Sequence, residues 1–313
     1  MVQGGHQVGR WSDWNATDQS TATVGQAMAT PTQSTKKSRY HVTTQNEVER
    51  AERHRSLTSK SRHLRDEARP TMGLQLWPED IVGFPIRLTR TALFGLPRRG
   101  RRQWFKEELV VSGLDTEVFY TGEQLDQKDL EVWLMLLMAF QGQDEDYMLR
   151  TRMSYMLKTL NRNTKGHSRI ALTSSLKRLA SASVYIKYRD GAVEGVFNFL
   201  HGIAWDTKTQ EVVLKLGRDL GRLFDVTAFI DFEKHVSLPS QMTKAVHKYA
   251  VGNKRGKPHA IPLNKLKKVL GYEGEVREFR KALIKAFAIL ESAGVLREAR
   301  IIDGMARWSL CKL

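Results

Sequence analysis

Cysteine is almost absent from this chain of 313 residues, and the single one, Cys311, lies near the C-terminus. One cysteine cannot build an intrachain disulfide framework or a cysteine-based zinc finger, and it fits a reducing cytoplasm. Long apolar runs are missing as well. Residues 132–140 form the most apolar stretch, which is shorter than the roughly 18 residues needed to span a bilayer. The N-terminus also lacks the apolar core of a secretory signal. We therefore expect a soluble, cytoplasmic protein.

The sequence also has few features of an enzyme. Its nine histidines are scattered, and none pairs with another at a spacing that would place both on one metal. Residues 252–258 read Gly-Asn-Lys-Arg-Gly-Lys-Pro, which differs from a nucleotide-hydrolysing phosphate loop. Three residues instead of four separate the glycines, and proline replaces the hydroxyl residue that would bind magnesium. We expect no cofactor, no metal and no catalytic residue.

What the chain does have is positive charge, gathered in two regions. Lys and Arg number 50 against 34 Asp and Glu, for a net charge of +16. Residues 150–190 hold ten bases and one acid, and residues 235–313 hold sixteen bases and six acids, whereas residues 111–149 hold one base and nine acids. Such segregation favours a polyanionic partner, although a basic run by itself is often only a solvated helix face.

Each basic region contains a helix followed by a β-hairpin. In the clearer copy, apolar residues recur at helical spacing over residues 274–293, and basic residues share the opposite arc. Strands are expected at 295–302 and 305–310, joined by Asp303 and Gly304, a strong hairpin signal. In the earlier copy, a helix at 168–181 precedes strands at 184–188 and 193–200. A helix that leads into a hairpin is how a winged helix ends.

The chain is long enough for two domains and a tail. Residues 1–70 are expected to be a disordered or partly helical basic tail, because the first 45 residues have too few branched aliphatics to offset the entropy of ordering. Residues 71–233 are predicted to form a first winged-helix domain and residues 234–313 a second. The predicted fold class is therefore α+β, with two tandem winged-helix domains after a disordered N-terminal tail.

The order of the other elements repeats in the two halves. The first half is expected to contain a strand pair at 106–120, a helix capped by Asp126, and helices at 147–160 and 168–181. After its hairpin come a strand at 211–216 and a connection at 220–232. The second half is expected to contain helices at 239–250, 262–270 and 274–293. We infer that the two halves share one architecture, although their amino-acid sequences do not repeat.

Several short motifs occur in a fixed order along the folded part of the chain. They are Trp-Pro-Glu at 77–79 with Pro85, Thr-Ala-Leu-Phe at 91–94 before a basic run, Tyr-Thr-Gly-Glu-Gln-Leu at 120–125, Leu-Glu-Val-Trp at 130–133, and Leu176, Arg178 and Leu179. Together they resemble the TrfA family of plasmid replication initiators. The resemblance spans roughly residues 75–313 and is most specific between 75 and 135.

That resemblance implies a bacterial, plasmid-encoded protein that binds repeated sites, called iterons, in double-stranded origin DNA. It also implies duplex opening, recruitment of the host initiator DnaA and the replicative helicase, and a possible homodimer. Relatives can carry a clamp-binding motif before the Trp-Pro segment. Here Gln75 and Leu76 run directly into Trp77 without the terminal Leu-Phe pair, which argues against clamp binding through this segment. No membrane partner is expected.

Basic and hydroxyl side chains on the two reading helices, the hairpins and the loop at 252–258 are the candidate DNA contacts. Arginine suits guanine because its fork matches two acceptors, whereas hairpin arginines suit phosphates. The candidates are Arg169, Thr173, Lys177, Arg178, Lys187, Arg189, Lys254, Arg255, Lys257, Arg277, Arg280, Lys281, Lys285, Arg297, Arg300 and Arg307. Two other functions stay open: a winged-helix transcriptional repressor, and a rolling-circle origin nickase, which the missing histidine pair disfavours.

Overall fold

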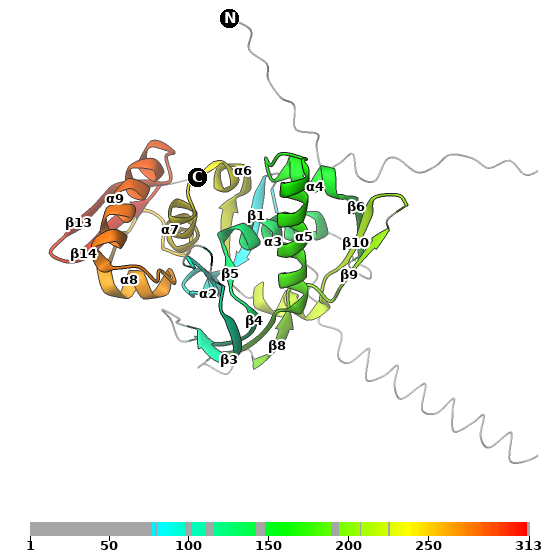
Figure 1. Cartoon of the computed structure of the whole chain (residues 1–313). Coiled ribbons are helices and arrows are strands. Elements are labelled where there is room, and N and C mark those ends of the chain that lie inside the picture. The colour runs from blue at the N-terminus through cyan, green and yellow to red at the C-terminus, as the bar shows by residue number, and fades with distance from the viewer. Residues whose placement is uncertain are drawn as a thin grey trace, which may run out of the picture. The chain divides into compact units, whose positions relative to one another are not determined.

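The computed structural model describes residues 77–311 apart from 79, 98–99, 101, 111–115, 142–147, 189–193, 207 and 225, and it leaves out the side chains of 218, 219 and 222. Helices and strands mix along the chain, which confirms the α+β prediction (Figure 1). Contacts divide the chain into residues 1–71 and residues 72–313. The predicted tail at 1–70 lies outside the described residues.

Helix α3 (Gln127–Phe140) lies at the centre of the first half. Asp126 begins it as predicted, because its carboxylate accepts hydrogen bonds from two N–H groups of the first turn, at 2.8 and 3.1 Å. Asp129 completes a capping box by accepting the N–H of Asp126 at 3.1 Å. Trp133 is fully buried in the middle of the helix. Its ring contacts those of Phe84, Phe94 and Phe199.

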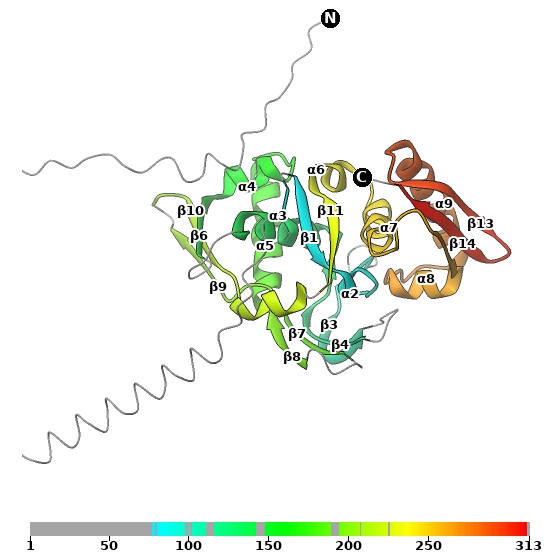
Figure 2. The same ribbon diagram turned by 180° about the vertical axis from the view of Figure 1, so that it is seen from behind.

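Short strands surround this helix. Strand β1 (Ile81–Pro85) pairs antiparallel with β11 (Thr227–Asp231), so the two ends of the first half lie side by side (Figures 1 and 2). Strand β2 (Phe94–Gly95) pairs in parallel with β5 (Leu125–Asp126). The other elements here are α2 (Ile86–Thr89), a 3-10 helix at Arg218–Phe224 and α6 (Phe232–Ser237).

The two halves share one sequence of elements. In the first, β6 (Met148–Arg152), α4 (Met153–Thr159) and α5 (Gly166–Ser181) come before the hairpin β9 (Gly202–Asp206) and β10 (Glu211–Lys215), and the antiparallel sheet has the order β6-β10-β9. In the second, α7 (Gln241–Val251) precedes β12 (Pro258–Pro262), α8 (Leu263–Val269), α9 (Val276–Ser292) and the hairpin β13 (Leu296–Ile302) and β14 (Met305–Leu310). Its antiparallel sheet has the order β12-β14-β13. Both halves therefore contain a strand, two helices and a hairpin in one sheet order, although the strands Ser183–Tyr188 and Glu194–Asn198 come between α5 and β9 in the first half.

The second half matches its sequence prediction closely. Phe279, Leu283, Phe287 and Leu290 of α9 are buried in one core with Trp308 of β14. Asp303 and Gly304 join the hairpin with φ of 49° and 71°. Positive φ at both central residues is typical of a type I′ turn, one of the two favoured two-residue hairpin turns.

Three predictions for the first half need correction. The helix expected at 147–160 begins only at Met153, because residues 148–152 alternate between exposed and buried and form the strand β6. The hairpin expected at 184–200 exists as β7 (Ser183–Tyr188) and β8 (Glu194–Asn198). It joins β3 (Trp104–Val110) and β4 (Thr116–Glu123) in a sheet of order β3-β4-β7-β8, which is separate from the sheet β6-β10-β9 that contains the strand before α4. The expected connection at 220–232 contains strand β11.

Segment 89–96 of the first half packs against the second half. The buried Lys248 of α7 donates to the Thr91 carbonyl at 2.8 Å, and the Arg90 guanidinium donates to the Gly252 carbonyl at 2.9 Å. The Leu96 N–H donates to the Gly271 carbonyl at 3.1 Å. The predicted domain boundary at 233/234 falls within α6, and the division into two domains stays a prediction.

Candidate nucleic-acid interface

Helix α9 presents its basic residues opposite its buried face. Arg277, Arg280, Lys281 and Lys285 are all exposed, whereas Phe279 and its apolar partners face the core. Lys281 Nζ lies 3.5 Å from Glu278, and both side chains are about 60% exposed (60% and 59%). Such an exposed pair contributes little to stability and leaves the cation accessible. The four candidates predicted on this helix thus share one solvent-facing arc.

The hairpin after α9 adds three exposed arginines. Arg297 and Arg300 lie on β13 and Arg307 lies on β14. Arg300 and Arg307 are direct cross-strand partners. Like charges directly opposite each other destabilise a strand pair, so an anion between the two guanidinium groups would be favourable. This hairpin therefore suits a phosphate backbone.

The basic loop at the end of α7 lies outside the core as predicted. Lys254, Arg255 and Lys257 are all exposed, and Gly256 has a φ of 70° that favours glycine. The Arg255 guanidinium donates to the Cys311 carbonyl at 3.3 Å, which holds the loop against the end of β14.

Helix α5 presents a smaller basic face in the first half. Arg169 and Lys177 are exposed, and Thr173 is half-buried between them. The Lys177 ammonium lies 5.9 Å from the centre of the Trp205 ring on β9, within the range of a cation–π contact. A groove of about 650 Å³ runs between α5 and β9, and Ile203 forms part of its wall.

Arg178 is placed differently from the other candidates. Its guanidinium donates to the Asp129 carboxylate at 2.7 and 3.1 Å, and the two side chains are 11% and 0% exposed. Arg102 reaches the same carboxylate at 3.1 Å and Asp126 at 2.6 Å. Arg178 points into the interior because α5 packs on α3, so we leave it out of the interface and assign it a structural role.

The candidates Lys187 and Arg189 are predicted on the hairpin at 184–200, whose strands β7 and β8 belong to the sheet β3-β4-β7-β8 and not to the sheet β6-β10-β9. Lys187 is exposed on β7, but its cross-strand neighbours are Glu117 and Glu194, whose carboxylates offset its charge. Arg189 lies outside the described residues. By its place in the sheet order, the first-half hairpin that corresponds to β13–β14 is β9–β10, and its turn carries the exposed Lys208.

Sequence reasoning missed Lys208 because strand β9 was not predicted. The turn does have a local signal. The Asp206 carboxylate accepts the N–H of Lys208 at 2.8 Å and that of Thr209 at 3.1 Å. These two hydrogen bonds lower the pKa of Asp206. An aspartate that accepts from the backbone two and three residues ahead is typical of a turn, so Asp206 before Lys208 and Thr209 could have identified the hairpin.

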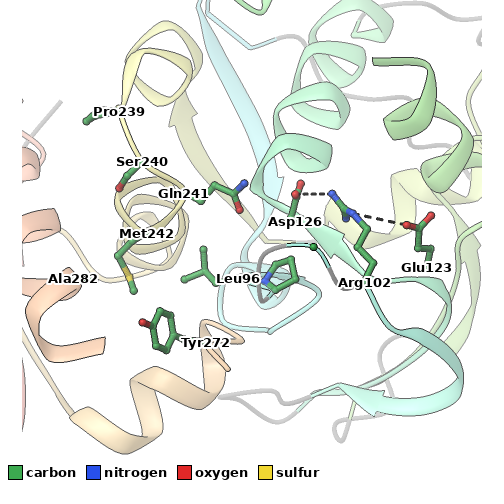
Figure 3. Close-up of a pocket in the computed structure, with 12 residues that line it drawn as sticks. Leu96, Arg102, Glu123, Asp126, Pro239, Ser240, Gln241, Met242, Tyr272 and Ala282 are labelled. Atoms are coloured by element: carbon green, nitrogen blue, oxygen red, sulfur yellow. Dashed lines mark hydrogen bonds and ion pairs between the residues drawn. The ribbon is translucent and has the colours of Figure 1, made fainter. Parts of the chain in front are cut away.

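A pocket of about 920 Å³ is lined by residues of both halves (Figure 3). Leu96, Met242 and Tyr272 form its apolar wall, and the Arg102–Asp126 ion pair forms its charged wall. Burial, followed by the neighbouring Asp129, raises the pKa of Asp126. Its carboxylate is nevertheless occupied by Arg102 and by the cap of α3.

In the part of the chain that the structure describes, no helix is long and apolar enough to cross a membrane. No group of three or more His, Cys, Asp or Glu side chains in the same residues could hold a metal ion.

Comparison with known proteins finds solved structures with a similar fold. No family model matches the chain, and no curated protein sequence matches it. The selenomethionine crystal structure of domains 2 and 3 of RctB is similar at 14% identity, with a TM-score of 0.50 over 74% of this chain and 99% of that one. A second crystal structure of RctB domains 2–3 is 12% identical, with a TM-score of 0.44 over 70% and 95%. The first likeness establishes a shared α+β fold.

Proposed function

We propose that this chain is a DNA-binding replication initiator built from two winged-helix units. The observation that carries the proposal is the repeated unit of strand, two helices and hairpin, whose second helix turns basic residues to solvent in both halves. In a winged helix the second of these helices reads the major groove and the hairpin contacts the backbone. Accordingly, α5 and α9 are the reading helices, and β9–β10 and β13–β14 are the wings.

Charge supports a polyanionic ligand. The second half exposes Arg277, Arg280, Lys281 and Lys285 on one helix and places two arginines opposite each other on the wing. RctB, whose domains 2 and 3 have a similar fold, is a replication initiator, which supports the same class here. We further propose iteron binding, duplex opening and recruitment of DnaA and the replicative helicase in the bacterial cytoplasm, with no catalytic activity. The TrfA resemblance itself stays a prediction.

The first test is sequence-specific binding by the full chain. We expect it to prefer duplex DNA that carries repeated origin sites over random duplex of the same length. R277A/K281A should weaken binding at least tenfold, because two phosphate or base contacts are lost. The matched control K106A/K187A removes the same charge from exposed positions on β3 and β7, and it should bind like the wild type. Equal affinity for origin and random duplex would contradict the proposal.

A transcriptional repressor with the same fold is the second candidate, since its reading helices would present the same basic arcs. The gene supplied in trans to a plasmid that carries only the origin should sustain replication for an initiator. DNA binding without replication would support the repressor instead. Covalent attachment of the protein to nicked origin DNA would indicate a nickase, and we expect none.

A further inference from the structure

Each proposed reading helix exposes one isoleucine in the middle of its solvent-facing arc. Ile170 of α5 is 68% exposed and Ile284 of α9 is 52% exposed. Neither belongs to the buried apolar row of its helix, which consists of Leu172, Leu176 and Leu179 in α5 and the Phe279 row in α9.

Basic and hydroxyl residues surround both isoleucines at helical spacing. Ile284 follows Lys281 by three residues, Arg280 by four and Arg277 by seven, so all four share one face. In α5, Ile170 precedes Thr173 by three residues and Lys177 by seven. Isolated exposed apolar side chains are ordinary on protein surfaces. Here, however, the same combination occurs on the corresponding helix of both halves.

The positive charges limit what can cover these isoleucines. A partner must be anionic around its edge and must offer a small apolar group at its centre. The major groove of DNA meets both conditions, because phosphates line its rim and the thymine 5-methyl is an apolar group on its floor. Isoleucine is also suited to the contact, since its β-branch holds χ1 almost entirely in one rotamer within a helix.

We propose that Ile170 and Ile284 each contact a thymine methyl group and so specify thymine at one position of the DNA site bound by each half. This inference rests on the proposed DNA-binding function. The neighbouring arginines and lysines bind phosphates or guanine, whereas the isoleucine distinguishes thymine from cytosine at a position with no hydrogen-bonding side chain. Burial of one methyl group against a side chain is expected to change affinity about three- to fivefold.

The test uses removal of the methyl group alone. Duplexes preferred by the full chain are selected from a random library, and each thymine of the selected site is replaced in turn by deoxyuridine, which keeps base pairing. We expect one position for each isoleucine at which the wild type loses three- to fivefold in affinity. I284A and I170A should each become insensitive to deoxyuridine at one of these positions, whereas K281A should weaken binding equally to thymine and uracil DNA.

The outcomes separate this inference from the function on which it rests. If the full chain selects no sequence, both fail. If it selects a sequence but I284A and I170A keep the wild-type response to deoxyuridine at every position, the methyl contact is wrong and the DNA-binding function stands. I284Q and I170Q provide second variants, because glutamine is a good helix former at an exposed position. They should lose the same deoxyuridine response.

Discussion

Arg178 of α5 and Asp129 of α3 form a buried, two-point ion pair. Nε and a terminal nitrogen of the guanidinium donate to the carboxylate at 3.1 and 2.7 Å. The two residues are 49 positions apart in the sequence. Asp129 also accepts the N–H of Asp126, so the same carboxylate caps α3 and holds α5. The pair therefore helps to hold α5, which carries the exposed Arg169 and Lys177, against α3.

R178A is expected to destabilise the fold. Removal of one partner from a buried pair leaves an uncompensated charge, and Arg102 compensates only in part, so we expect a loss of about 3 kcal/mol in the free energy of unfolding. Urea denaturation measures it. The matched control R169A, at an exposed position of the same helix, should change stability by less than about 0.5 kcal/mol and weaken DNA binding. An R178A protein as stable as the wild type, with weaker DNA binding, would instead place Arg178 in the interface.

The sequence could not distinguish Arg178 from its exposed neighbours. It lies at the border of the apolar face of α5, and its partner Asp129 belongs to a helix that local spacing cannot place beside it. The same limit explains why the hairpin at 184–200 was assigned to the wrong sheet. The sequence pattern predicts the two strands, but it does not say which sheet a hairpin joins, and here β7 pairs with β4.

The second half was predictable because its signals are local. Each boundary of α9 and of its hairpin follows from residues within a few positions, such as the apolar row from Phe279 to Leu290 and the Asp303–Gly304 turn. The exposed basic residues of α9 are the predicted ones, since the apolar face of a helix alone fixes which arc meets solvent. Lys248 was not predicted to be buried, because its neighbour Thr91 comes from the first half.

Lys248 should make the free energy of unfolding depend on pH in the range above pH 7. Burial lowers the pKa of its ammonium to about 7, and its described hydrogen bond is to the Thr91 carbonyl. Above pH 7 the folded side chain is neutral while the unfolded one stays protonated up to its ordinary pKa of about 10.4. The unfolded state then binds more protons, so stability rises with pH, by roughly 4 kcal/mol between pH 7 and 10.

K248M isolates this contribution. We expect it to be more stable than the wild type at pH 6, where the wild type buries a charge, and to lack the rise above pH 7. The control K265M replaces an exposed lysine on α8 and should keep the wild-type slope. Denaturant melts at several pH values measure both. A K248M slope equal to that of the wild type would show that Lys248 does not titrate in this range.

His235 and His247 should make the fold sensitive to acid. Their Nδ1 atoms lie 3.0 Å apart in the interior, and burial lowers the pKa of His247 to about 4 and that of His235 well below its ordinary value. The unfolded rings bind protons near pH 6.5 while the folded rings stay neutral. The contribution of these two histidines to the free energy of unfolding is therefore fully present above pH 6.5, and it is lost as the pH falls toward 4.

H235L/H247L removes both rings together and so leaves no ring nitrogen unpaired. We expect this double variant to lose less stability between pH 6.5 and 4 than the wild type. H167Q changes an exposed histidine of α5 and should follow the wild-type curve. Thermal melts across this pH range provide the comparison. Parallel curves for the wild type and the double variant would contradict the prediction.

The position of the first wing can be tested by salt dependence. If β9–β10 is the wing, K208A removes one phosphate contact and lowers the slope of log affinity against log salt concentration by about 0.9. K187A should leave that slope unchanged, because Glu117 and Glu194 flank Lys187 on the neighbouring strands. Both changes remove one exposed lysine from the first half, so net charge is matched. A reduced slope for K187A with none for K208A would show that the β7–β8 hairpin faces DNA, as the sequence pattern first suggested, and that the correspondence of the two halves does not extend to their wings.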